Sequence, residues 1–351
     1  MRPELTNVHP QKETKGLNKW FSGVDSIRII LAIIVLLSHI DNAYANALKH
    51  SAHSLLRYSG YFLANAFDGT SAVIAFFIIS GFVIHYPNKN GISNLKEFWI
   101  RRFVRVLIPL AVIVLVGTQF NHPEKAVTWS LYCELIYYTI YPFLYKINIS
   151  WRNKFIIAYT IAAILILSLA YHDVLAFIKQ SNSNYQGYYW QFGVWLTWII
   201  GLPCWLLGVL IAEHIDNLTG TTFKSLIFYR VLVYGISCFC CFAKFHLHIS
   251  YILSMNIFAL VLYKWIQTEI VYYKKAAPIN SLEKMGKFSY SLYLCHPLLY
   301  IILGLFITNT VLTYPLFILL IILFSYLFYL AIEKPSHIIA RKINSKYNPI
   351  A

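Results

Sequence analysis

The sequence predicts an all-α integral membrane protein, a helical bundle of about ten transmembrane helices with both termini in the cytoplasm. Three observations lead to this fold class. Hydrophobic residues make up 58% of the 351 residues and charged residues only 12%, which is more apolar surface than a soluble core needs. Long apolar runs recur along the whole chain, separated by short charged segments. The basic residues are distributed unevenly between alternate segments.

The apolar runs define the predicted spans. Each run is long enough, as a helix, to cross roughly 30 Å of hydrocarbon, the shorter ones when tilted or partly covered by neighbours. The predicted spans are residues 24–41, 66–86, 103–120, 127–146, 155–171, 190–212, 226–243, 247–266, 288–307 and 311–332. Residues 24–333 therefore form the predicted transmembrane domain, between cytoplasmic segments at residues 1–23 and 334–351.

The basic residues set the predicted orientation. With both termini in the cytoplasm, 23 of the 29 Lys and Arg residues lie in inner segments or in the span ends beside them. Five lie in outer loops, and Arg28 lies inside the first span. This excess of inner positive charge is typical of membrane proteins. The net charge of +15 is thus explained by topology, and no nucleic-acid partner is expected.

Several enzyme classes lack support in this sequence. The motifs GxxxxGK[ST], HExxH and GxSxG are absent, as is a GxGxxG segment between a strand and a helix. The six cysteines all fall within predicted spans and lack the spacing of a zinc site, so we expect packing residues and no metal site. Any chemistry is therefore expected in a cavity among the helices.

The first span contains an arginine and a histidine separated by ten apolar or small residues. Eleven helical steps of about 100° return to within roughly 20° of the start, so Arg28 and His39 share one helix face, ~16 Å apart along the axis. An intramembrane charge is costly unless it faces a cavity or a partner, which makes a functional role the first interpretation. The orientation puts Asp25 and Arg28 near the inner surface and His39 in the outer half, where a neutral imidazole can act as a general base. The alternative is an interfacial histidine bonded to a neighbour.

The fourth span carries a second intramembrane charge, Glu134. Ser130, Glu134 and Tyr138 repeat along one helix face, with Trp129 beside them. A buried carboxylate needs a partner, and both Arg28 and His39 are candidates. The tyrosines at the inner end could equally form an interfacial aromatic belt.

Three arginines, Arg101, Arg102 and Arg105, precede the apolar part of the third span. Placed around a helix N-terminus, they would form a phosphate site. A cytoplasmic anchor that touches lipid headgroups explains them equally well. In the ninth span, His296 is expected to face inward, where it either binds substrate or only packs.

Together, these segments resemble the acyltransferase family 3 of polytopic membrane acyltransferases. The hallmark element, an arginine and a histidine ten residues apart, matches Arg28 and His39. The other matching segments, in chain order, are Phe76-Phe-Ile-Ile-Ser80-Gly81, Arg101-Arg102-x-x-Arg105, Trp129-Ser130-Leu-x-x-Glu134-x-x-x-Tyr138, Ser289-Tyr290-Ser-Leu-Tyr-Leu-x-His296 and Glu333-Lys-Pro335. Leu135 replaces the second acid that commonly follows Glu134 in the family, so a paired carboxylate is not expected here.

The resemblance implies an O-acyltransferase of the bacterial inner (plasma) membrane. Family members commonly transfer acetyl from cytoplasmic acetyl-CoA to a carbohydrate hydroxyl at the outer face, for example on lipopolysaccharide O-antigen, peptidoglycan or another polysaccharide of the cell envelope. Acetyl-CoA is then a donor substrate, and no permanently bound cofactor is expected. Longer relatives append an SGNH-type domain, for which no segment here is long enough, so this chain is expected to perform both halves of transfer. The oligomeric state is left open, a homodimer being one alternative.

The resemblance also suggests roles for individual residues. His39 is expected to act as base, Arg28 to hold the donor or offset negative charge, and Glu134 to orient or balance these groups. The three arginines of the third span are expected to bind CoA. Substrate-binding candidates are Asp25, Ser80, Trp129, Ser130, Tyr138, Tyr290 and His296. The rival interpretation is a transporter or flippase for a glycan or acyl carrier, because charged pairs near the midplane also mark transport routes.

Overall fold

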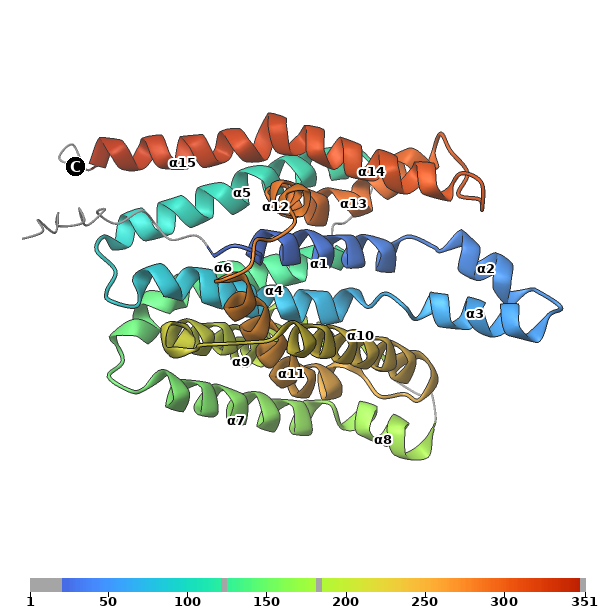
Figure 1. Ribbon diagram of the computed structural model, residues 1–351, viewed down its shortest axis with the longest axis horizontal. Coiled ribbons are helices and arrows are strands. Elements are labelled where there is room, and N and C mark those ends of the chain that lie inside the picture. Colours follow the sequence, from blue (N-terminus) through green and yellow to red (C-terminus); the bar gives the residue numbers. More distant parts are fainter. Residues whose placement is uncertain (1–20, 121–124, 181–184, 348–351) are drawn as a thin grey trace, which may run out of the picture.

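The fold is helical throughout the residues that the structure describes, which are 21–120, 125–180 and 185–347 of a computed structural model (Figure 1). No strand occurs in those ranges. The longer helices are α1 (Val24–His39), α4 (Gly69–His85), α5 (Leu95–Gln119), α6 (Lys125–Lys146), α7 (Trp151–Leu169), α9 (Gly193–His214), α10 (Phe223–His246), α11 (Tyr251–Tyr273), α13 (Ser289–Gly304), α14 (Tyr314–Phe328) and α15 (Lys334–Tyr347). The shorter ones are α2 (Ala43–Lys49), α3 (Ser54–Ala64), α8 (Tyr171–Lys179), α12 (Asn280–Gly286), the 3₁₀ turns η1 (Tyr86–Asn88) and η2 (Ile215–Asn217), and the π-helical turn η3 (Tyr329–Glu333).

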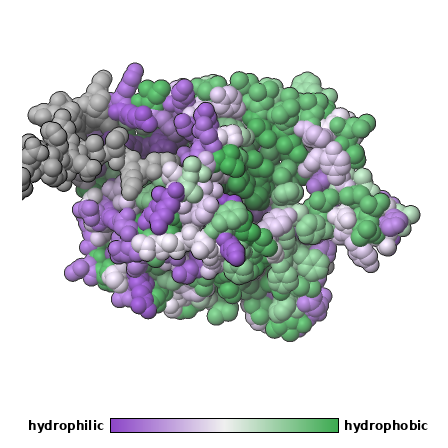
Figure 2. Space-filling view, in the orientation of Figure 1, coloured by the Kyte–Doolittle hydropathy of each residue, from purple (hydrophilic) through white to green (hydrophobic). Residues whose placement is uncertain are grey.

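Five helical stretches of the described chain are long and apolar enough to cross a membrane. They are Ser54–Asn88, Trp151–Leu169, Gly193–Asn217, Phe223–His246 and Tyr314–Ile343. Each residue range predicted as a span contains a helix. That about ten helices cross the membrane and that both termini are cytoplasmic stay predictions. Figure 2 shows hydrophilic residues gathered towards the left-hand end of this face of the molecule and hydrophobic residues over most of the rest.

Helices α4 and α9 form the centre of the bundle and pack closely along each other. Small residues allow this approach: a Cβ atom on Gly81 would overlap the carbonyl of Trp205, and one on Gly208 would overlap the carbonyl of Ile78. Close backbone contact of this kind is typical of helix pairs in membranes. Helices α1, α6, α7 and α11 surround this pair, so α1 is held against a rigid centre (Figure 1).

The start of α1 is fixed by a carboxylate from α12. Glu283 Oε1 accepts hydrogen bonds from Gly23 N at 3.0 Å, Ser26 N at 2.9 Å and Ser26 Oγ at 2.6 Å. The two N–H groups among these donors belong to the set that a helix leaves unsatisfied at its N-terminus. Helix α1 also packs against α4 and α13. The helix that carries Arg28 and His39 therefore has neighbours on several sides.

Segments predicted to lie outside the spans also contain helices. Residues 42–65 contain α2 and α3, which pack against each other and project beyond the other helices at the right of Figure 1. Gly60 permits this contact, because its Cβ would lie 2.6 Å from Lys49 N. Residues 334–347 form α15, which continues from α14 through η3 and packs along α5. The other residues of the predicted end segments, 1–20 and 348–351, lie outside the described residues.

Candidate active site

The pair predicted on the first span lies on α1, with Arg28 near the start of the helix and His39 as its last residue. Arg28 is partly buried and its Nη1 lies 3.4 Å from Asp25 Oδ1, so two of the predicted site residues form an ion pair. The separation of Arg28 and His39 along the helix places them at opposite ends of α1. The two residues therefore belong to different parts of the site.

A hydrogen bond to the backbone fixes the tautomer of His39. The Nδ1 atom lies 2.8 Å from the carbonyl oxygen of Val35 and 3.2 Å from Ser38 Oγ. Since a carbonyl oxygen can only accept, Nδ1 carries the proton and Nε2 keeps its lone pair. No described group forms a hydrogen bond with Nε2, so its lone pair is available to accept a proton.

His39 lines a cavity of about 680 Å³ at its end of the bundle. The cavity wall combines aromatic rings with hydrogen-bonding and charged groups, a lining typical of a site for a polar organic ligand. Its polar and charged residues are Ser38, His39, Asp41, Asn42, Asn46, Lys49, Asp68, Thr70 and Lys244, and its aromatic residues are Phe67, Trp129, Tyr188, Trp190, Phe245, Tyr251 and Tyr293. Trp129, a predicted substrate-binding residue, is part of this wall.

His296 lies next to His39. The ring centroids of His39 and His296 are 5.0 Å apart, and His296 is fully buried. Its Nδ1 lies 3.1 Å from the carbonyl oxygen of Leu292, which again leaves the lone pair on Nε2. That buried Nε2 has no hydrogen-bond partner among the described residues. The structure therefore brings the two histidines together, which the sequence did not predict.

Glu134 accepts hydrogen bonds from neutral groups. Ser80 Oγ donates to Glu134 Oε1 at 2.9 Å, and the hydroxyl of Tyr138 donates to the same oxygen. The described hydrogen bonds and ion pairs of Glu134 include neither Arg28 nor His39. Trp205 Nε1 donates to Ser80 Oγ at 3.3 Å and extends the network into α9. Two hydroxyls thus satisfy Oε1 of this carboxylate locally.

The arginine cluster is divided by the structure. Helix α5 begins at Leu95, where the Asn94 side chain accepts from Glu97 N at 3.1 Å. The arginines thus lie in its second and third turns, and the predicted phosphate site at a helix N-terminus is wrong. Arg101 is exposed and paired with Glu97 on the same helix. Arg102 covers the ring of Phe98 at 3.7 Å and donates to the carbonyl of Phe98 at 2.9 Å.

Arg105 interacts with charged residues on other helices. It interacts electrostatically with Arg28, Glu134 and Glu333. Glu333 is 2% exposed, and its Oε2 accepts from Ser291 N at 3.1 Å and Ser291 Oγ at 2.5 Å. We call Arg28, Arg105 and Glu333 the arginine–glutamate cluster. It gathers charges from α1, α5 and η3 at the end of the bundle opposite to His39.

Glu333 was missed as a site residue because its position depends on an irregular turn. It is the last residue of the π-helical turn η3, which lies between α14 and α15. Such single turns inside α-helices are frequent at functional sites. An ordinary helical register does not predict which side Glu333 faces. The signal available in the sequence was therefore the family resemblance, which includes the segment Glu333-Lys-Pro335.

The remaining predicted substrate residues serve as contacts between helices. The Ser130 hydroxyl lies 2.6 Å from the Tyr293 hydroxyl, which links α6 to α13. Tyr290 donates to the carbonyl of Val106 at 3.0 Å, which links α13 to α5. Neither side chain is among those that line the cavity. Among the described residues, no group of three His, Cys, Asp or Glu side chains could hold a metal ion.

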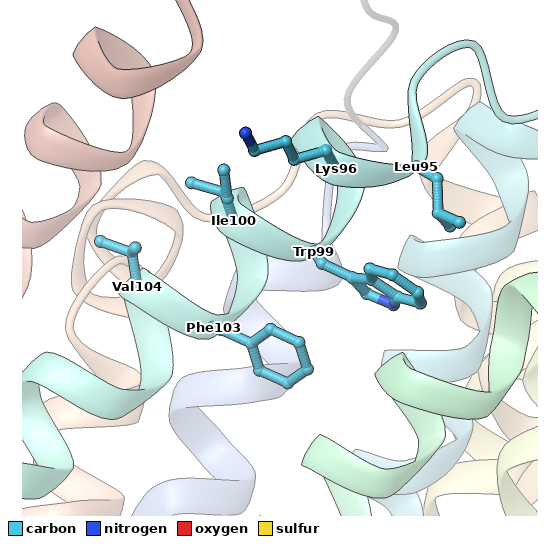
Figure 3. Close-up of a pocket in the computed structure, with 6 residues that line it drawn as sticks. All are labelled: Leu95, Lys96, Trp99, Ile100, Phe103 and Val104. Atoms are coloured by element: carbon cyan, nitrogen blue, oxygen red, sulfur yellow. The ribbon is translucent and has the colours of Figure 1, made fainter.

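A second hollow, of about 540 Å³, lies along one face of α5 (Figure 3). It is lined by Leu95, Lys96, Trp99, Ile100, Phe103 and Val104. The lining is almost entirely apolar and includes none of the three arginines. Trp99 and Phe103 point to the same side, and Trp99 Nε1 donates to the carbonyl of Tyr138 at 3.1 Å. This hollow suits lipid tails better than a charged donor.

Comparison with known proteins gives two matches. Residues 21–330 match the family described as the acyltransferase domain. The chain is also similar to the peptidoglycan O-acetyltransferase OatA of Listeria monocytogenes serovar 1/2a, with 26% identity over 156 residues. That alignment covers 41% of this chain and 21% of the relative, so about a fifth of the relative's length is matched. No solved structure matches the chain.

Proposed function

This chain belongs to the acyltransferase family, and we propose that it transfers an acetyl group from acetyl-CoA to a hydroxyl group of a cell-surface or lipid-linked carbohydrate. The observation that carries the proposal is that Nε2 of His39 has no hydrogen-bond partner among the described residues. His39 lines a cavity whose wall offers both aromatic and hydrogen-bonding groups. The name of the similar peptidoglycan O-acetyltransferase makes peptidoglycan one acceptor to test first. A membrane O-acyltransferase needs such a cavity to bring a hydroxyl to the base.

In the proposed reaction, Nε2 of His39 takes the proton of the acceptor hydroxyl as its oxygen attacks the thioester carbon. The carbon–oxygen bond forms, and the carbonyl oxygen takes the negative charge. When this intermediate collapses, the carbon–sulfur bond breaks and the thiolate receives the proton from His39. General base catalysis of this kind contributes roughly 10²–10⁴-fold to a rate. The Nδ1 bond to Val35 keeps the imidazole in the required tautomer throughout.

The donor is proposed to approach from the other end of α1. Arg28 and Arg105 offer guanidinium groups that can bind phosphate or offset negative charge, and Glu333 lies between α13 and α5 to position them. The elongated pantetheine arm would then pass along α1 and bring the thioester to His39. Arg102 is close to this route, whereas Arg101, paired with Glu97 at the surface, contributes less.

The proposed orientation has the arginine–glutamate cluster on the cytoplasmic side. Support comes from the excess of Lys and Arg in the segments at that end and from the hydrophilic region in Figure 2. His39 and its cavity would then face the outside, where envelope carbohydrates are found. The membrane in question is proposed to be the bacterial inner membrane.

Purified protein in lipid vesicles, incubated with labelled acetyl-CoA and soluble peptidoglycan or O-antigen fragments, tests the proposal. We expect label on the carbohydrate with the unchanged chain and with His172→Gln, an exposed histidine on α8. We expect a loss of about 100-fold or more with His39→Gln, whose amide cannot accept a proton. Equal transfer by His39→Gln would refute the role of the base, and movement of substrate without acetylation would favour a transporter.

A further inference from the structure

Lys244, the buried lysine at the end of α10, lines the same cavity as His39 but has no role in the reaction described above. The residue is 4% exposed. Its Nζ lies above three aromatic rings, at 3.7 Å from the centroid of Tyr188, 4.1 Å from that of Phe245 and 5.3 Å from that of Tyr251. An ammonium group in such surroundings is attracted to the ring faces, but the rings do not neutralise its charge.

No carboxylate within the described residues forms an ion pair with Lys244. Asp68 acts on it only at longer range. The oxygens of Asp68 accept from Thr70 N at 3.0 Å and from Ser71 Oγ at 2.6 Å. Burying a charge is costly without a paired opposite charge, so the cavity holds a cation whose natural complement is an anionic group on a ligand.

The other carboxylate at the cavity wall is also occupied. Both oxygens of Asp41 accept from Asn46 Nδ2, at 2.8 and 2.9 Å. Lys49, on α2, adds a second lysine to the lining. Asp41 and Asp68 thus accept hydrogen bonds from neutral donors. Neither cavity lysine forms an ion pair with a described carboxylate, so both can bind an anionic ligand. Charge complementarity in this arrangement favours an acidic ligand over a basic one.

The wall beside Lys244 offers a surface for a sugar ring. The rings of Tyr188 and Trp190 are stacked, with centroids 5.0 Å apart and planes 22° from parallel. Both side chains are exposed and line the cavity, at 43% and 37% exposure. A flat aromatic face with an apolar body and polar edge suits the apolar face of a pyranose while its hydroxyls reach hydrogen-bonding groups.

We propose that the cavity selects an acidic carbohydrate, a uronate-type sugar whose carboxylate pairs with Lys244 Nζ while its ring packs on the free face of Trp190. This inference rests on the proposed function and specifies its acceptor. A single buried ammonium balances the single negative charge of a sugar carboxylate, whereas a phosphate monoester carries nearly two at neutral pH. The paired carboxylate holds the sugar so that one of its hydroxyls reaches His39 Nε2.

Matched acceptors test this inference without depending on any variant. The assay measures acetyl transfer from labelled acetyl-CoA to short oligosaccharides that contain glucuronate, galacturonate or mannuronate. The same oligosaccharides after carboxyl reduction, which converts each uronate into the neutral hexose, are the comparison. With the unchanged protein, we expect kcat/KM to be about tenfold higher or more for the acidic form of at least one of these oligosaccharides, the effect of one charge-assisted contact.

Variants of Lys244 assign the preference to this side chain. We expect the acidic preference to fall to within about twofold in Lys244→Gln and to return in Lys244→Arg, which keeps the charge. Lys264→Gln is the matched control, since Lys264 also lies over a tyrosine ring, at 5.5 Å from Tyr263, but on the exposed side of α11. Equal transfer to acidic and reduced acceptors, or a preference that survives in Lys244→Gln, would overturn the inference and leave the proposed function intact. Transfer to no carbohydrate at all would contradict the proposed function, and the inference would fall with it.

Discussion

The imidazole rings of His39 and His296 lie 5.0 Å apart between their centroids, and each ring donates its Nδ1 proton to the carbonyl four residues earlier in its own helix. Both Nε2 atoms therefore carry lone pairs. One belongs to the ring that lines the cavity, and the other is buried behind it without a described partner. A buried acceptor without a partner is uncommon, because it costs about 1–3 kcal/mol. It is retained here beside the proposed base, where it can accept a hydrogen bond during the reaction.

His296 is predicted to position the reacting groups through Nε2. Replacing it with Leu should lower kcat about tenfold or more without changing the KM for acetyl-CoA, because the proposed donor site lies at the other end of α1. Gln places an oxygen near the position of Nε2 and should retain more activity than Asn, whose amide mimics Nδ1. Steady-state kinetics with each variant measure this order. Equal losses in Gln, Asn and Leu would instead indicate a packing role.

Two arginines on α5 should differ in their effect on donor binding. Arg105 belongs to the arginine–glutamate cluster, whereas Arg101 is exposed and paired with Glu97. Arg105→Gln is therefore expected to raise the Kd for CoA about tenfold or more, the loss of one charge-assisted contact, and Arg101→Gln less than about twofold. Isothermal titration with CoA in detergent compares the two. A larger effect at Arg101 would move the donor site to the start of α5.

The hydroxyl of Tyr138 should stabilise the fold through Glu134. Tyr138→Phe removes one of the two hydroxyls that donate to Glu134 Oε1 and is expected to lower stability by about 1–2 kcal/mol. Tyr132→Phe, at an exposed position of the same helix, serves as the control. Thermal unfolding in detergent gives the difference. In a Glu134→Gln background the effect of Tyr138→Phe should shrink, and strict additivity of the two substitutions would contradict the coupling.

The contact between α4 and α9 should tolerate no side chain at Gly208. A Cβ atom there overlaps the backbone of Ile78, so Gly208→Ala is expected to destabilise the protein by about 1–3 kcal/mol. Gly235, on α10, has nothing within 4 Å of its Cβ position, so Gly235→Ala should be neutral or stabilising by up to about 1 kcal/mol. Melting temperatures of the two variants measure the contrast. Equal melting temperatures would mean that α4 and α9 can separate at little cost.

The sequence predicted those features that depend on the order of residues within one helix. Arg28 and His39 lie on α1, and a helix covers each predicted span, because apolar runs and helical periodicity are local properties. The family resemblance, carried by short motifs in order, agrees with the match over residues 21–330. Features of this kind need no knowledge of which helices are neighbours.

Contacts between helices could not be predicted in this way. Arg28 and His39 were the candidate partners of Glu134, but its described hydrogen bonds come from Ser80 on α4 and Tyr138. Glu333 faces inward because a π-helical turn changes the register of its helix, which no periodic pattern indicates. Lys244 counted as an outer-loop charge in the sequence, yet α10 continues through it and buries it against three rings. In each case the decisive neighbour comes from a distant part of the chain.

The bond between His39 and Val35 has a consequence for how this chain can change over generations. In many enzymes the base is aligned by a second side chain, so one substitution in that partner disables the site. Here the aligning atom is a main-chain carbonyl, which every amino acid at position 35 would supply. A mutation of His39 removes the imidazole, but no replacement of Val35 removes the main-chain carbonyl that orients it. The helical backbone itself therefore orients the proposed base.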